Sequence, residues 1–186
     1  VQNNGIINHY EYIINSEGTI EIRHVLKPEG KMPLWFPRIG LTLTVSDALD
    51  QVKWYGRGPQ ENYPDRKTGY PTGIYASTVQ AMYEPYLMPQ DYGLRTDVRW
   101  LQLTTDKGIG LQFKMNEWFN FNIYPYSTDN LTKAMYTYQL QKQKGMTLNL
   151  DYATTGVGCT ARGVFGAYKA MPQEYRRTIS IRPMMK

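Results

Sequence analysis

The densest group of side chains able to bind or react lies in residues 54–67, WYGRGPQENYPDRK. Such a loop could bind a polyol, because aromatic rings stack on sugars while polar side chains bond the hydroxyls. The same side chains could instead brace irregular backbone through Arg–carboxylate pairs, and we favour bracing because charged loops are usually structural. The candidate groove residues of this loop are Trp54, Arg57, Glu61, Asn62, Asp65 and Arg66.

Two carboxylates of this loop, Glu61 and Asp65, also suggest the acid and the nucleophile of a glycosidase. That chemistry requires the two carboxyl groups to lie about 5 to 9.5 Å apart. Spacing along a loop does not fix this distance, so the pair stays an open candidate.

A second cluster in residues 85–100 leads from a loop into a strand. Arg95, Asp97 and Arg99 alternate there with residues that are mostly apolar, so one strand face is charged. The row of charges either forms a salt-bridged sheet face or lines a polar groove, with Arg95 and Arg99 as groove candidates. Both interpretations remain open.

Other motifs carry less chemistry. Residues 156–161, GVGCTA, formally match a dinucleotide fingerprint, but no helix pattern follows, so we interpret them as a glycine-rich loop. His9 and His24 lie in strand patterns and are interpreted as packed or surface histidines. The single cysteine, Cys159, excludes a disulfide framework, and no metal-ligand spacing occurs.

The elements that must position these residues are short strands. Period-2 or apolar stretches predict strands over 6–14, 19–26, 38–45, 51–55, 94–103, 109–115, 118–124, 146–152 and 175–181. One short helix is expected after Ser127, and residues 56–89, with five prolines, predict a long irregular excursion. Strands without intervening helices favour antiparallel pairing in a sandwich or barrel.

Length and composition describe an ordinary folded chain. The 186 residues suffice for one domain, and 41% are hydrophobic. No apolar run approaches the roughly 18 residues of a membrane span, so we expect a soluble chain with no membrane partner. The net charge of +5 is spread along the sequence, which argues against a nucleic-acid partner. The compartment is not indicated.

The two polar clusters, together with residues 119–123 (FNFNI) and 148–151 (LNLD), resemble the C-terminal small-chain domain of large multidomain β-galactosidases of the lactose-cleaving type. The resemblance runs in order from the hairpin at Tyr10 through residues 37–41 (PRIGL) to about Gly158. It weakens after Cys159, where only a final strand at 175–181 matches.

The resemblance implies an all-β antiparallel super-sandwich, similar to galactose mutarotases, in a single domain over residues 1–186. The two catalytic glutamates of such enzymes lie upstream in a (β/α)8 barrel, so this chain would hold no catalytic residue. The sequence starts without Met, so we interpret it as a piece of a longer protein. The resemblance implies that this piece is the C-terminal fragment of a larger glycosidase, with its first strands missing. No cofactor is expected in the chain, although the full enzyme would use Mg and a monovalent cation by resemblance.

The family domain also lends an aromatic side chain to the rim of the sugar site, just before the Leu-Asn-Ile-Asp segment. At the matching place this sequence has Thr147, so the stacking platform is expected to be absent or moved, and Tyr152 is a candidate substitute. Asn149 and Asp151 complete the rim candidates. The departure at Thr147 leaves the preferred β-glycoside open.

The leading hypothesis is a noncatalytic domain of a β-galactosidase that shapes the rim of the sugar site and supports the barrel. Its partners would be a β-galactoside and the catalytic barrel, and a homo-oligomer is left open. One alternative is a self-standing aldose mutarotase or epimerase, which would recruit His9 or His24 with Glu61, Asp65 or Asp97 as base and acid. A carbohydrate-binding module is the other alternative.

Overall fold

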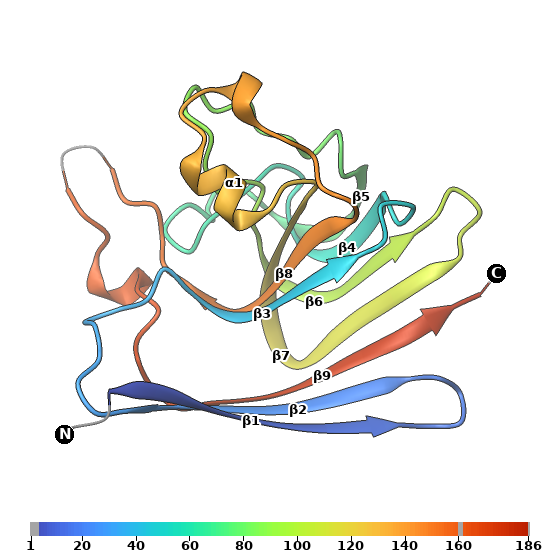
Figure 1. Ribbon diagram of the computed structural model, residues 1–186, viewed down its shortest axis with the longest axis horizontal. Helices are drawn as coiled ribbons and strands as arrows, with labels where there is room; N and C mark the ends of the chain where they lie inside the picture. The colour runs from blue at the N-terminus through green and yellow to red at the C-terminus, as the bar shows by residue number, and fades with distance from the viewer. Residues whose placement is uncertain (1–3, 160–161, 186) are drawn as a thin grey trace.

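The protein is described by a computed structural model over residues 4–159 and 162–185. Figure 1 shows strands in most parts of the chain and the short helix α1. The elements are β1 Gly5–Ile14, β2 Ile20–Glu29, β3 Arg38–Val45, β4 Gln51–Arg57, β5 Thr72–Thr78, β6 Arg95–Thr104, β7 Gly110–Tyr124, α1 Thr128–Lys133, η1 Thr137–Gln139, β8 Met146–Thr154, η2 Gly166–Tyr168 and β9 Tyr175–Met184.

All named strand pairs are antiparallel and belong to one sheet of nine strands. The main path runs β1-β2-β9-β7-β6-β4-β5, and β8 pairs with both β7 and β3. The sheet is not closed into a barrel, which is consistent with a sandwich. The predicted all-β fold class is therefore confirmed.

The 15-residue strand β7 divides the sheet into two branches. Its first part, from Gly110 to Met115, pairs with β9, whereas residues from Asn120 to Tyr124 pair with β8. Two separate strands over 109–115 and 118–124 had been predicted, and this was wrong because no glycine or proline interrupts residues 116–117. The branch β9-β2-β1 consequently diverges from the branch β8-β3 (Figure 1).

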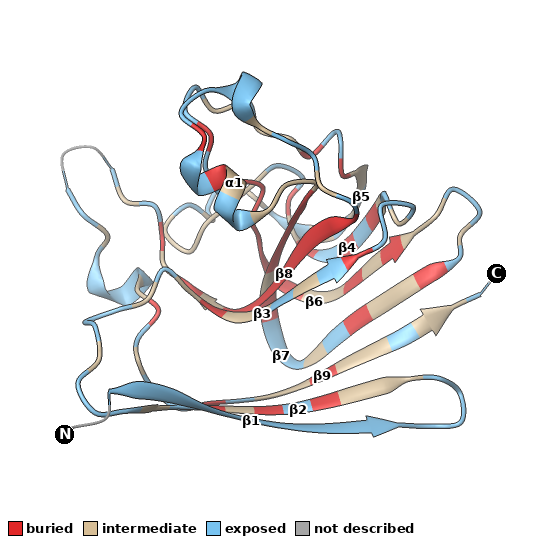
Figure 2. Ribbon diagram, viewed as in Figure 1, coloured by how far each residue is buried: buried red, intermediate tan, exposed pale blue. Residues whose placement is uncertain are grey.

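The two branches face each other across a shared core. Ile22 of β2 and Ile179 of β9 belong to the same buried cluster as Leu148 and Leu150 of β8. Figure 2 shows β8 buried along most of its length, while β1 is exposed throughout. A strand that is buried on both faces of a sheet lacks the alternation of buried and exposed residues, as β8 shows.

Two further predictions need correction. The excursion over 56–89 contains the strand β5, which alternation did not reveal because its side chains are only partly buried or exposed. The strand predicted over 19–26 ends later than expected, since β2 extends to Glu29. Pro28 is tolerated there because pairing with β9 ends at Leu26, leaving a partner on one side only.

The helix expected after Ser127 is confirmed. Ser127 is the N-cap of α1, and its hydroxyl accepts a hydrogen bond from the Asn130 amide at 3.0 Å. Helix α1 buries Leu131 against a small aromatic cluster that includes Tyr92 and Tyr124. This cluster stands apart from the main core.

Candidate functional site

Antiparallel pairing brings the two polar clusters of the sequence together. β4 pairs with β6 from Gln51 opposite Thr104 to Tyr55 opposite Trp100. The end of β4 therefore lies beside the start of β6, and the loop after β4 packs on the segment before β6. The loop cluster, defined here as residues 57–67 with residues 86–99, is the first candidate site.

Glu61 is the hub of the loop cluster. Its carboxylate accepts hydrogen bonds from the Gly93 amide at 2.8 Å, from the Tyr63 hydroxyl at 3.1 Å and from the Tyr86 hydroxyl. Burial first, and then the facing Glu61, raise the pKa of Tyr63 well above its usual range. Both tyrosines therefore remain donors, and Glu61 is held as a brace between the two segments.

Asp97 closes the other side of the loop cluster. It lies in a β-bulge of β6 with a positive φ of 55°, and its carboxylate accepts from Arg57 at 2.6 Å and from Lys67. Burial favours a higher pKa for Asp97, but the hydrogen bonds from Lys67 and Arg57 outweigh it and lower the pKa. Arg99 stacks on the exposed Trp118, with 3.9 Å to the ring centroid.

Trp54, Asn62 and Arg95 are buried beneath this cluster. The Trp54 indole donates to the Arg57 carbonyl at 3.0 Å, and Asn62 accepts from the Thr96 amide and hydroxyl. Arg95 donates to the carbonyls of Pro59 and Gly93, and burial lowers its pKa to about 10. The Trp54 ring is fully buried, so it offers no face for stacking on a sugar.

Asp65 and Arg66 fasten the loop cluster to the segment that follows β8. Asp65 accepts from the amides of Val157 at 3.1 Å and Gly158 at 2.7 Å, and Arg66 donates to the Gly158 carbonyl at 2.8 Å. A Cβ at Gly156 would lie 2.4 Å from the Asp65 carboxyl carbon, so the close approach requires glycine there. Glycines 156 and 158 thus serve a loop contact, while residues 160–161 of the fingerprint match lie outside the described residues.

A pocket of about 460 Å³ opens beside this contact. Asp65, Arg66 and Tyr168 line it together with Phe165, whose side chain is 65% exposed. The sequence prediction missed Phe165 because its neighbours show no strand or helix pattern. An exposed aromatic ring following a glycine-rich loop was the available signal.

The remaining rim candidates lie on β8 inside the sheet. Asp151 is 2% exposed and forms a two-point ion pair with Arg38 of β3, at 2.6 and 3.2 Å. Burial raises the pKa of Asp151 to about 6 despite the facing Arg38. Asn149 donates to Asn122, and Asn122 in turn accepts from Arg38. These residues form a buried polar network between β3, β7 and β8.

Thr147 and Tyr152 are also buried. The Thr147 hydroxyl donates to the Tyr126 carbonyl at 2.7 Å. The Tyr152 hydroxyl lies 2.7 Å from Nδ1 of His24, which joins β8 to β2 across the core, and burial lowers the pKa of His24. His9 lies on the exposed strand β1. The structure therefore places His24 with Tyr152 and Asn8, and not with Glu61, Asp65 or Asp97.

Over residues 4–159 and 162–185, no group of three or more His, Cys, Asp or Glu residues is arranged to hold a metal ion. Among the described residues, no helix is long and apolar enough to cross a membrane.

The open antiparallel sheet and its locked loops define an all-β domain of the sandwich class. The chain belongs to the beta galactosidase small chain family, whose profile matches residues 2–181. This confirms the resemblance drawn from the two polar clusters.

Three curated relatives, each named beta-galactosidase, illustrate the family. The chain is 38% identical to the protein of Priestia megaterium over 147 residues, which is 79% of this chain and 14% of the relative. It is 39% identical to that of Vibrio cholerae over 122 residues (66% and 11%) and 33% identical to that of Pseudoalteromonas haloplanktis over 159 residues (83% and 14%). The chain thus spans about a seventh or less of these relatives.

Proposed function

We propose that this chain is a noncatalytic part of a β-galactosidase, which shapes the rim of the sugar site and supports the catalytic barrel during hydrolysis of terminal β-galactosides. The family and the named relatives support a glycoside hydrolase context. The reaction would be retaining hydrolysis through a glycosyl-enzyme intermediate, with both carboxylates supplied by the barrel.

The observation that carries the noncatalytic role is the bonding of the carboxylates. Glu61, Asp65, Asp97 and Asp151 each accept at least two hydrogen bonds from this chain's own backbone or side chains. A glycosidase acid must instead reach the glycosidic oxygen, and its partner must reach the anomeric carbon. Carboxylates committed to bracing are poorly placed for either step.

The rim role is best supported at the pocket beside Asp65. The exposed ring of Phe165 offers a stacking surface, and Arg66 beside it is fixed by its bond to Gly158. Thr147, the residue at the position first expected to face the sugar, is buried. The rim contact is therefore assigned to Phe165 and Arg66 rather than to position 147.

A paired assay tests this proposal. Hydrolysis of a chromogenic β-galactoside is measured with the 186-residue chain alone, with the barrel-containing remainder of its parent protein alone, and with the two mixed. We expect no hydrolysis by the chain and a gain of activity on mixing. A chain carrying Phe165→Ala should restore activity on mixing, but with a higher KM. Phe36→Ala, a packing change near the core, should instead lower the stability of the chain and leave the KM unchanged.

Two outcomes would overturn the proposal. Hydrolysis by the chain alone, lost in Glu61→Gln or Asp65→Asn, would make these residues catalytic. A folded remainder that is fully active without the chain would remove the supporting role.

A further inference from the structure

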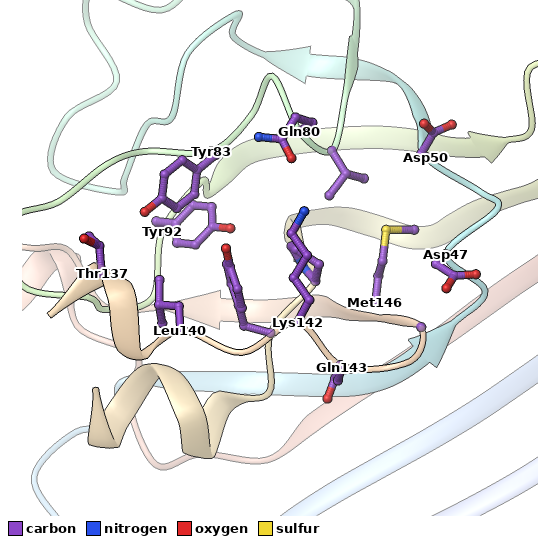
Figure 3. Close-up of a pocket in the computed structure, with 14 residues that line it drawn as sticks. Asp47, Asp50, Gln80, Tyr83, Tyr92, Thr137, Leu140, Lys142, Gln143 and Met146 are labelled. Carbon is purple, nitrogen blue, oxygen red and sulfur yellow. The ribbon is translucent and has the colours of Figure 1, made fainter. Parts of the chain in front are cut away.

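A second pocket, which shares only Tyr92 with the loop cluster, lies between three loops (Figure 3). It is about 520 Å³ in volume, within the range of about 300–1,000 Å³ typical of small-molecule sites. The walls come from the β3–β4 turn, from the segment after β5 and from the segment before β8. The polar and aromatic residues among them are Asp47, Asp50, Gln80, Tyr83, Tyr92, Tyr126, Thr137, Lys142 and Gln143.

Tyr92 supplies an unusual feature of this pocket. Tyr92 is only 3% exposed, yet its hydroxyl has no hydrogen-bond partner within residues 4–159 and 162–185. Buried hydroxyls are normally bonded, because leaving one unbonded is unfavourable. Figure 3 shows the Tyr92 hydroxyl directed into the pocket. A ligand in the pocket would complete its bonding.

The orientation of Tyr92 is fixed by its neighbours. Its carbonyl accepts from Asn122 at 2.9 Å, and the next amide, of Gly93, donates to Glu61. Its ring packs edge-on against Tyr83 at 5.3 Å and lies 5.4 Å from the ring of Tyr124. Burial raises the pKa of Tyr92, so the hydroxyl keeps its proton and acts as a donor. The site therefore presents a preorganised donor for a ligand oxygen.

The lining limits the chemistry of the ligand. Tyr83 and Tyr92 lie at one end of the pocket in Figure 3 and Asp47 and Asp50 at the other, with Lys142 between them. Two carboxylates disfavour an anion such as a phosphate, and the lysine disfavours a cation seated on the tyrosines. Aromatic faces, carboxylate and amide groups together suit a neutral molecule with many hydroxyls.

We propose that this pocket binds a neutral saccharide of one or two rings, with the Tyr92 hydroxyl donating to a sugar oxygen and a tyrosine ring covering a C–H face. This site does not depend on the hydrolytic role proposed above, since it is built only from residues of this chain. It would give the chain a sugar affinity of its own.

Titration of the isotope-labelled 186-residue chain with D-galactose and with lactose, followed by two-dimensional NMR, tests the proposal. We expect chemical-shift changes confined to the pocket walls, with saturation in the millimolar range. Tyr92→Phe removes only the hydroxyl and should weaken binding about fivefold, the usual effect of one hydrogen bond. Gln80→Ala, a change at an exposed side chain of the wall that cannot disturb the core, should also weaken binding.

Tyr175→Phe is the matched control, because its hydroxyl is bonded elsewhere, to the Met171 carbonyl at 3.0 Å, and sugar affinity should not change. The absence of shifts with both sugars would overturn the proposal. Equal affinity of the Tyr92→Phe chain would do the same, since the site would then lie elsewhere. Saturable binding of choline in place of sugar would reassign the pocket to a cation.

Discussion

The carboxylates of the loop cluster and the hydroxyl of Tyr92 in the pocket differ in how completely they are hydrogen-bonded. Glu61 accepts three hydrogen bonds, whereas the Tyr92 hydroxyl, one residue away from a Glu61 donor, has none within the described residues. Glu61, Asp65 and Asp97 of the cluster each accept at least two hydrogen bonds, so they stabilise irregular backbone. The pocket instead contains a buried hydroxyl without a hydrogen bond, which a ligand can satisfy. The conspicuous carboxylates therefore brace loops here, and the proposed binding site is identified by a missing hydrogen bond instead.

The largest expected effect comes from breaking the bracing at Arg38. Arg38→Met leaves the buried Asp151 without its cation, which should lower the free energy of unfolding by about 3 kcal/mol at neutral pH. Urea denaturation followed by tryptophan fluorescence measures the loss. Arg23→Met, which removes an exposed ion pair on β2, is the matched control and should change little.

The pH dependence of that loss sharpens the test. The folded pKa of Asp151, about 6, lies above its ordinary value of 3.8, so the free energy of unfolding falls as pH rises between these values. Without Arg38 the pKa rises further and the fall extends to higher pH. The difference between wild type and variant should be small near about pH 4 and largest above about pH 7. An equal loss at both pH values would show that the buried charge is not its source.

A smaller effect is expected at Glu61. Glu61→Gln keeps the shape of the side chain but removes the charge that three donors share, which should lower the free energy of unfolding by about 2 kcal/mol. Amide hydrogen exchange at Gly93 should quicken as well. Glu117→Gln, at an exposed residue of β7, is the reference; a loss no larger than in that variant would mean that Glu61 does not brace the loops.

The smallest expected change in the free energy of unfolding comes from removing single tyrosine hydroxyls, one bonded (Tyr175) and one unbonded (Tyr92). Tyr175→Phe breaks the bond to the Met171 carbonyl and should lower the free energy of unfolding by about 1 kcal/mol. Tyr92→Phe should leave it unchanged or raise it slightly, because an unbonded buried hydroxyl is removed. Thermal unfolding without sugar compares the two. A loss in Tyr92→Phe equal to that in Tyr175→Phe would erase the contrast between pocket and cluster.

Much of the fold could be predicted from alternation. The strands β1, β3, β4, β6, β8 and β9 lie where period-2 or apolar runs predicted them, because a half-buried strand alternates and a fully buried one does not. The unbroken β7 and the edge strand β5 were not predicted. Their limits depend on which neighbours they pair with, and local sequence does not encode those neighbours.

The candidate site was predictable as a set of residues but not as a set of roles. Residue types and spacing identified Glu61, Asp65 and Asp151 as polar groups of interest, yet each could have faced a ligand or a partner. Their partners, Gly93, Gly158 and Arg38, lie 32, 93 and 113 residues away along the chain. Only folding brings such groups within bonding distance.

By itself, the sequence determined the all-β class, the short helix and the family, because these follow from periodicity, capping and motifs that are local. The tertiary structure decided which polar side chains are bonded to one another and left the Tyr92 hydroxyl without a partner among the described residues. The physical reason is that a hydrogen bond needs both groups in place, and at Tyr92 the pocket walls come from segments spread over residues 47–146.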